Sequence, residues 1–159
     1  MAKFTKIIHE NSENLLIKKF IRLFYKNLRK RLISNNRFSF VLTGGKSPIK
    51  LYKFLANCRH IPWKKIDFFI GDERYVKEDS KNSNINLCKK YLLNKIKISN
   101  HQIYKITTNK KSIKKDTQEY EKKIKKYFLN KKIAFDLILL GIGQDGHIAS
   151  LFTNNINKN

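Results

Sequence analysis

Apolar and polar side chains alternate at helical spacing in several stretches of the chain. The longest stretch runs from Ser12 to Ser34, where leucine and phenylalanine recur every three or four positions between lysines and arginines. This spacing predicts one long amphipathic helix, and Ser12 is a residue type that caps helix N-termini. The same reasoning predicts shorter helices over 49–56, 83–95 and 115–129.

Three apolar runs instead have the length and composition of strands, namely Phe38–Leu42, Ile66–Ile70 and Phe135–Leu140. A fourth run, Ile103–Ile106, predicts a shorter strand. Because strands and helices alternate, we expect an α/β fold with a mainly parallel sheet. The 159 residues contain no repeat and no linker, so a single domain over 1–159 is expected.

The formal net charge is +23, which raises the question of a nucleic-acid partner. Most of the basic residues are lysines, spread from Lys3 to Lys158, and asparagine and isoleucine are abundant as well. These three residue types rise together when coding DNA is AT-rich, whereas nucleic-acid surfaces favour arginine forks and interleaved aromatic residues. We therefore expect no nucleic-acid partner, although the charge would still attract an anionic substrate.

The remaining composition excludes several classes of protein. No apolar stretch approaches the roughly 18 residues that a membrane span needs, and the first residues do not resemble a secretion signal. A cytoplasmic protein without a membrane partner is expected. Cys58 and Cys88 have no metal-binding or redox spacing, so we expect two free thiols and no metal site. Nothing in the composition predicts an oligomeric state.

Each of the three strong strands is followed by a loop rich in glycine and ionisable residues. Ligands of parallel α/β sheets bind outside the carboxyl ends of the strands, so neighbouring strands would bring these loops to one pocket. The first loop suits an anion, because glycines expose backbone N–H groups, a lysine adds charge, and a helix follows. Its residues are Gly44, Gly45, Lys46 and Ser47, with Ser47 and Pro48 expected as the N-cap and first helical residue.

The second and third loops carry the groups that suit a reaction. Arg74 can grip a phosphate through two parallel hydrogen bonds, and Asp72 could orient Arg74 or bind sugar hydroxyls. His147 follows Gly143, Asp145 and Gly146 at an expected helix start, and imidazole suits proton transfer near neutral pH. Each loop also has a purely structural interpretation, as a chain turn, a surface ion pair or a histidine that fills space.

Three segments resemble the motifs of the 6-phosphogluconolactonase family. They are LTGGKSP at Leu42–Pro48, GDERYV at Gly71–Val76 followed by Ser83 and Asn84, and FDLILLGIGQDGHIASLF at Phe135–Phe152. That family belongs to a superfamily with the glucosamine-6-phosphate deaminases, which implies a Rossmann-like, three-layer fold. Members typically continue well beyond this point. The chain is therefore expected to hold the N-terminal two-thirds of the fold and to expose apolar faces.

The resemblance implies hydrolysis of 6-phosphoglucono-1,5-lactone to 6-phosphogluconate in the oxidative pentose phosphate pathway, without a metal or organic cofactor. It implies His147 as the catalytic base, the loop Gly45–Ser47 and Arg74 as substrate and phosphate contacts, and Asp72 and Asp145 as supporting residues. An oxyanion formed on the lactone carbonyl needs donors, for which backbone N–H groups near Gly143 or Gly146 are candidates. Asp145 could also hold the imidazole in its useful tautomer.

The chain departs from the family at several positions, including Lys46, where a small hydroxyl residue is usual, and Lys77, where proline is usual. Ile148 is the residue that the deaminases prefer. The deaminases follow it with Ala-Phe-Asn-Glu, whereas this chain has Ala-Ser-Leu-Phe over 149–152, which argues against deamination. A deaminase-like sugar-phosphate isomerase and an inactive, basic binding remnant both stay open as alternatives.

Overall fold

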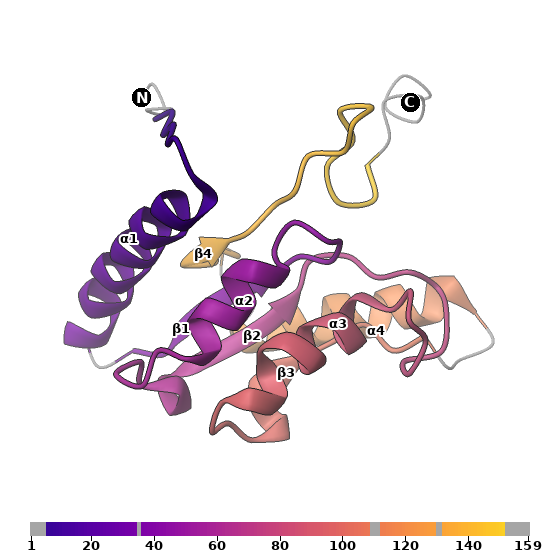
Figure 1. The fold of residues 1–159 in the computed structure, drawn as a ribbon. Helices are drawn as coiled ribbons and strands as arrows, with labels where there is room; N and C mark the ends of the chain where they lie inside the picture. The colour runs from indigo at the N-terminus through magenta and orange to yellow at the C-terminus, as the bar shows by residue number, and fades with distance from the viewer. Residues whose placement is uncertain (1–5, 35, 109–111, 130–131, 152–159) are drawn as a thin grey trace.

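The computed structural model describes residues 6–34, 36–108, 112–129 and 132–151. Helices and strands alternate along them, as the apolar spacing predicts (Figure 1). The longer elements are α1 (Glu13–Ile33), β1 (Phe38–Leu42), α2 (Ile49–Ala56), β2 (Ile66–Ile70), α3 (Asn84–Tyr91) and α4 (Ile113–Tyr127). The short elements are strands β3 (Ile103–Tyr104) and β4 (Leu137–Ile138) and the 3-10 turns η1 (Trp63–Lys65), η2 (Leu93–Lys95) and η3 (Asn100–Gln102).

The strands form a parallel sheet in the order β3-β2-β1-β4, which confirms the expected α/β class. β1 and β2 pair along their whole length, from Phe38 opposite Ile66 to Leu42 opposite Ile70. Both strands are buried at every position, as their largely apolar sequence predicts. Because the strands are parallel and in register, the loops that follow β1 and β2 leave the sheet at the same edge.

β4 is shorter than the strand predicted over Phe135–Leu140. In the described part of the chain it pairs with β1 alone, and the Leu139 N–H donates one further bond to the Val41 carbonyl at 3.0 Å. Ile138 and Leu140 are 49% and 52% exposed. A strand paired on one side gains only one ladder of hydrogen bonds, so fewer of its residues are fixed in the strand geometry.

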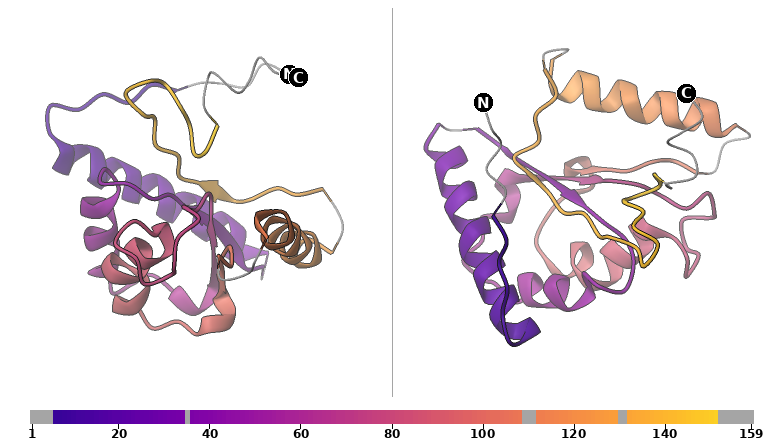
Figure 2. Two further views of the ribbon diagram at one scale, coloured as in Figure 1. Left: turned by 90° about the vertical axis from the view of Figure 1, so that its right-hand side faces the viewer. Right: turned by 90° about the horizontal axis from the view of Figure 1, so that it is seen from above.

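The sheet lies between two layers of helices. α1, α2 and α3 cover one face and α4 covers the other (Figure 2). On the first face, Phe24 of α1 packs against Phe40 of β1 with ring centroids 5.5 Å apart. On the second face, Phe69 of β2 stacks on Tyr104 at 4.5 Å and meets Tyr127 of α4 at 5.0 Å. Alternate side chains of each strand thus serve two different cores.

Two predicted helix starts have different outcomes. Ser12 caps α1 as expected, and its hydroxyl accepts the Leu15 N–H at 3.3 Å. The predicted cap at Ser47 is wrong, because α2 begins at Ile49 with no side-chain cap. A turn closed by the Ile49 N–H and the Lys46 carbonyl at 3.2 Å comes first, which moves the helix start along the chain.

The other helices deviate from prediction at their ends. α3 ends at Tyr91, because Leu92 has φ −135° and ψ −66° and leaves helical geometry. The helix predicted over 83–95 is therefore a short helix followed by the turn η2. α4 begins at Ile113, two residues earlier than predicted, after a cap by Ser112. No helix among the described ranges is long and apolar enough to cross a membrane.

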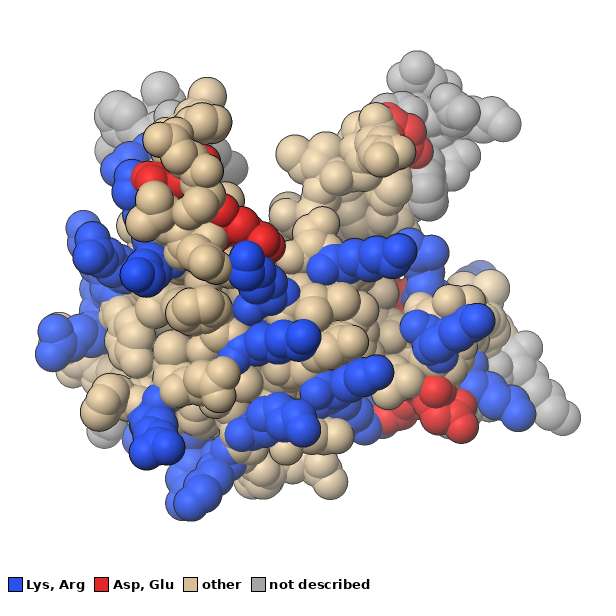
Figure 3. Space-filling model, viewed as in Figure 1, with Lys and Arg blue, Asp and Glu red and all other residues tan. Residues whose placement is uncertain are grey.

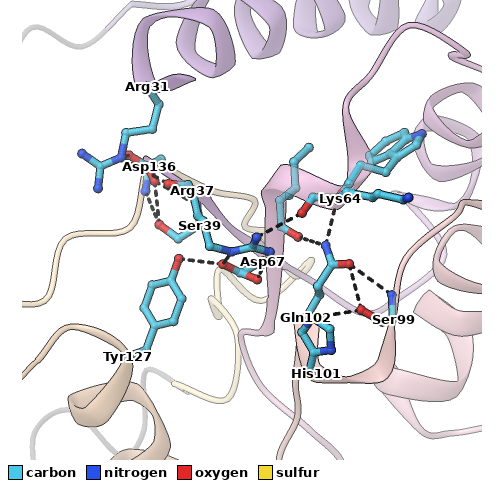
Figure 4. Close-up of polar contacts among 12 residues, drawn as sticks. Arg31, Arg37, Ser39, Lys64, Asp67, Ser99, His101, Gln102, Tyr127 and Asp136 are labelled. Carbon is cyan, nitrogen blue, oxygen red and sulfur yellow. Dashed lines mark hydrogen bonds and ion pairs between the residues drawn. The ribbon is translucent and has the colours of Figure 1, made fainter. Parts of the chain in front are cut away.

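At the amino ends of the strands, charged side chains are paired with one another (Figure 4). Arg37 donates two hydrogen bonds to the buried carboxylate of Asp67, at 2.5 and 2.6 Å, and the Tyr127 hydroxyl donates a third at 3.0 Å. The Asp136 carboxylate accepts both the N–H and the hydroxyl of Ser39 at 2.8 Å. These bonds join β1, β2 and α4 and satisfy the buried polar groups of this edge.

Candidate active site

The three glycine-rich loops meet at the carboxyl edge of the sheet, as the strand order predicts. They enclose a hollow of about 170 Å3. Seven predicted site residues line it, namely Gly44, Gly45, Ser47, Asp72, Arg74, Gly143 and His147. Lys46, Asp145 and Gly146 are neighbours of these residues in sequence but do not line the hollow. Segments far apart in the chain therefore form one polar site.

The first loop has a backbone that only glycine suits. Gly45 has φ 85°, which a residue with a Cβ rarely adopts. A Cβ on Gly44 would lie 1.8 Å from the side-chain oxygen of Asn84, so this position has no room for one. The loop begins at Thr43, whose N–H and C=O both bond the buried Tyr52 hydroxyl, at 3.0 and 2.6 Å. The path of the loop is fixed from its first residue.

In the second loop, Glu73 serves the fold rather than the hollow. Its carboxylate accepts the backbone N–H groups of Asn84 at 2.6 Å and Ile85 at 2.9 Å. These amides begin α3, where the helix dipole favours a negative charge. The same carboxylate accepts the Arg74 N–H at 2.8 Å. Arg74 therefore extends from a backbone segment that is tied directly to the start of α3.

Asn84 joins the first and second loops, although its motif did not predict a site role for it. Its side-chain amide donates to the Asp72 carbonyl at 2.9 Å, and it lines the hollow directly beside Gly44. Its place after the N-cap Ser83 could be read from the sequence as a helix start. The contact with Gly44 could not, because it depends on how α3 packs beside the loop after β1.

The third loop is a tight turn. The Gly143 N–H donates to the His147 carbonyl at 2.9 Å, and the Gly146 N–H donates to the Gly143 carbonyl at 3.0 Å. Gly146 has φ 80°, and a Cβ on Gly143 would lie 2.2 Å from the His147 ring. Both amides are already used within the turn. The expectation that backbone N–H groups near Gly143 or Gly146 bind an oxyanion stays a prediction.

His147 and Asp145 contact each other through the imidazole Nδ1 and a carboxylate oxygen. The hydrogen bond from His147 is the main reason that the pKa of Asp145 is lowered. A carboxylate at Nδ1 fixes the ring orientation. This contact supports the expectation that Asp145 holds the ring.

The described chain after His147 turns instead of starting the expected helix. Ile148 forms isolated antiparallel bridges with Ile142 and Leu151, and Ala149 has φ 53°. A left-handed residue at this point stops a right-handed helix. The turn places the Ser150 hydroxyl 3.0 Å from the Asp72 carboxylate, so it ties the third loop to the second.

No group of three or more histidine, cysteine or acidic side chains in the described ranges could hold a metal ion. Cys58 and Cys88 are free thiols. Burial raises the pKa of Cys88 to about 12, so this thiol stays protonated and does not act as a nucleophile. The ionisable side chains that line the hollow are Asp72, Arg74 and His147.

Comparisons with known proteins point to one family. A family model described as glucosamine-6-phosphate isomerases/6-phosphogluconolactonase matches residues 11–158. A 6-phosphogluconolactonase of Synechocystis is 35% identical over 144 residues, covering 89% of this chain and 60% of the relative. One of Thermotoga maritima is 36% identical over 125 residues, covering 79% of this chain and 54% of the relative. The chain thus spans little more than half the length of these two curated relatives.

Solved structures give the same picture. The crystal structure of the 6-phosphogluconolactonase from Thermotoga maritima superposes with a TM-score of 0.77 at 33% identity, over 86% of this chain and 60% of that one. The 6-phosphogluconolactonase from Trypanosoma cruzi superposes with a TM-score of 0.83 at 28% identity, over 97% of this chain and 64% of that one.

Proposed function

Because the chain belongs to the family of glucosamine-6-phosphate isomerases and 6-phosphogluconolactonases, we propose that it hydrolyses 6-phosphoglucono-1,5-lactone. The product is 6-phosphogluconate, and the reaction belongs to the oxidative pentose phosphate pathway. The observation that carries this proposal is that Arg74 and His147 line one hollow, with the His147 ring held by Asp145. A cytoplasmic location is proposed with it.

The phosphate would bind at the side of the hollow formed by the first two loops. Arg74 borders this side, and its guanidinium makes no hydrogen bond or ion pair within the described part of the chain. A guanidinium can donate two parallel hydrogen bonds to a phosphate. Glycines that expose backbone N–H groups beside it add donors for the same anion. Binding the phosphate far from the carbonyl would orient the lactone for attack.

His147 would act as the general base. It would take a proton from water as the water oxygen bonds to the lactone carbonyl carbon, which gives a tetrahedral oxyanion. The imidazolium formed, stabilised by Asp145, would lie close to the oxyanion and offset its charge. When the bond to the ring oxygen breaks, that oxygen would take the proton from His147 and become a hydroxyl group. The carboxylic acid then loses its own proton to water.

The deaminase-like alternative uses the same fold and a related sugar phosphate. The sequence 149–152 lacks the glutamate that the deaminases place there, and no other observation in the hollow favours ring opening. The basic binding alternative predicts one charged surface for an anion. Lysines and arginines are instead dispersed over the visible face of the molecule (Figure 3). This distribution supports the interpretation of the charge as compositional.

The test is the disappearance of freshly made 6-phosphoglucono-1,5-lactone, with the rate of spontaneous hydrolysis subtracted. We expect an excess rate that saturates with substrate and requires no added metal. Glucosamine 6-phosphate serves as the second substrate, and no ammonia should be released from it. Ammonia release without lactone hydrolysis would favour the deaminase-like function. Salt-sensitive nucleic-acid binding without either activity would favour the basic binding module.

A further inference from the structure

The loop that carries Arg74 is anchored on both sides of that residue. On one side, Glu73 binds the first amides of α3. On the other side, the Tyr75 hydroxyl donates to a carboxylate oxygen of Asp116 at 2.9 Å. Asp116 lies in the first turn of α4, on the opposite face of the sheet from α3. The two residues that flank Arg74 are thus tied to two different helix starts.

Asp116 is an unusual residue for a structural role alone. It is 1% exposed, and its second carboxylate oxygen has no hydrogen-bond partner in the described ranges. Leaving a buried polar atom unpaired costs free energy of folding. Its place at a helix N-terminus offsets part of this cost, because the helix dipole favours a negative charge there. An apolar residue would avoid the cost, so the bond to Tyr75 is the feature that Asp116 adds.

The backbone beyond Tyr75 is also bonded to the segment that precedes α4. The Val76 carbonyl accepts the Thr108 hydroxyl at 2.5 Å. The Val76 N–H donates to the Arg74 carbonyl at 2.7 Å and closes a tight turn. Thr108 belongs to the segment between β3 and α4. The anchor at Asp116 is therefore part of a wider attachment of this loop to the start of α4.

We infer that Asp116 is a positioning residue, which holds Tyr75 and so fixes the backbone from which Arg74 reaches the substrate phosphate. The inference rests on the proposed function only for the identity of that ligand. An arginine side chain is long and flexible, and it binds a phosphate through two bonds only when its origin is fixed. Releasing Tyr75 should therefore weaken substrate binding and leave the proton-transfer step at His147 unchanged.

The chain offers a matched control for this test. Tyr127 also donates from its hydroxyl to a buried aspartate, Asp67, at 3.0 Å, but it does so at the amino ends of the strands. Tyr75→Phe and Tyr127→Phe each remove one tyrosine–aspartate hydrogen bond. We expect Tyr75→Phe to raise KM for the lactone about tenfold with little change in kcat, since small misplacements of binding groups have large effects. Tyr127→Phe should leave both constants unchanged.

Two substitutions at Asp116 separate position from charge. Asp116→Asn keeps an oxygen that accepts the Tyr75 hydroxyl, so KM should stay near that of the parent. Asp116→Leu fills the same space without an acceptor, so KM should rise as in Tyr75→Phe. A KM for Asp116→Leu and Tyr75→Phe that matches Tyr127→Phe would overturn the proposal. A fall in kcat with unchanged KM would do so as well.

Hydrogen exchange of the backbone amides of Arg74 and Val76 tests the positioning role without measuring catalysis. Tyr75→Phe should speed this exchange at least fivefold relative to the parent, while Tyr127→Phe should not. If the parent protein fails to hydrolyse the lactone, the proposed function fails, and the exchange rates alone decide the positioning role. Unchanged exchange in Tyr75→Phe would refute that role whether or not the parent is active.

Discussion

The two ends of the sheet use charged residues in opposite ways. At the amino ends, Arg37 and Asp67 bond each other and Tyr127 adds a third contact. At the carboxyl ends, Arg74 and Lys46 make no side-chain hydrogen bond or ion pair within the part of the chain that the structure describes. Basic residues on loops or strands joined to β1 and β2 are thus paired at one end of the sheet and left for solvent or ligand at the other.

This difference follows from the cost of burying charge. A buried carboxylate such as Asp67 is tolerated only when donors surround it. The charged side chains at the amino ends of the strands are therefore bonded to one another. The carboxyl-end loops are more exposed, and their glycines leave room for a hollow in which donors are accessible to an anion. Charged groups that the fold does not use therefore mark the candidate site more clearly than the overall charge of +23.

Removing Arg37 should have the largest effect on stability. Arg37→Ala leaves the Asp67 carboxylate buried, with the Tyr127 hydroxyl as its one remaining side-chain donor among the described residues. We expect the free energy of unfolding to fall by about 2 kcal/mol, less than for a fully buried pair because the arginine side chain is 42% exposed. Urea unfolding measures this change. Lactone hydrolysis per folded molecule should stay the same, and its loss would break the distinction between the two ends.

Removing Arg74 should weaken ligand binding and leave stability nearly unchanged. Arg74→Ala should weaken the affinity for 6-phosphogluconate about 10- to 100-fold, since a charge-assisted bidentate contact is lost. Its effect on the free energy of unfolding should stay within about 0.5 kcal/mol, as for other exposed residues. Titration calorimetry and urea unfolding of one preparation give both values. Arg74→Lys keeps the charge but loses the two parallel donors of the guanidinium. Its affinity for 6-phosphogluconate should lie between that of the parent and that of Arg74→Ala.

Tyr52→Phe should moderately lower both the stability of the protein and its affinity for the ligand. The Tyr52 hydroxyl is the partner of both backbone groups of Thr43, at the start of the first loop. Without it, those groups lose their bonds in a buried place, which should cost about 1–2 kcal/mol of unfolding free energy. Affinity for 6-phosphogluconate should fall as well, because the loop path changes. A stability loss with unchanged affinity would show that this loop does not contact the ligand.

The smallest expected effect concerns Glu78. Hydrogen bonds from Lys105 and then Lys89 lower the pKa of Glu78 below its ordinary value of 4.5. A lowered pKa in the folded state stabilises the protein above the ordinary pKa, and this contribution is lost as the pH falls through the folded value. Glu78→Gln should therefore unfold more easily by about 0.5 kcal/mol at pH 7. Urea unfolding at a pH low enough to protonate this carboxyl in the folded state should show no difference from the parent.

Much of the fold could be predicted from local pattern. The spacing of apolar residues indicated α1, and largely apolar runs indicated β1 and β2, because these elements bury long stretches of side chains. The meeting of the loops followed from parallel strand direction together with the neighbourhood of the strands, which the structure supplies. Chain turns were harder to predict. The turn at Ala149 replaces an expected helix, and the turn before Ile49 displaces the expected cap at Ser47, because each depends on contacts made by a few backbone atoms.

The site was predictable in its residue types and only partly in its contacts. Gly44, Arg74 and His147 all line the hollow, as their motifs suggest. Asn84 bridges two loops through tertiary packing, and no periodicity in the sequence reports such a bridge. Asp116 is the clearest case, since a lone aspartate in a lysine-rich helix resembles an ordinary surface residue until the structure shows it buried against Tyr75.

The central claim is that the carboxyl-end loops form a hydrolytic site around His147. The most direct measurement is the excess rate of 6-phosphoglucono-1,5-lactone hydrolysis for the parent, His147→Ala and His101→Ala. His101 lies in η3, where its ring contacts only Ser99 among the described residues, and it serves as the matched histidine. We predict a rate that falls about 10²- to 10⁴-fold in His147→Ala and is unchanged in His101→Ala. No excess rate in a folded parent, or equal rates in the parent and His147→Ala, would contradict the account.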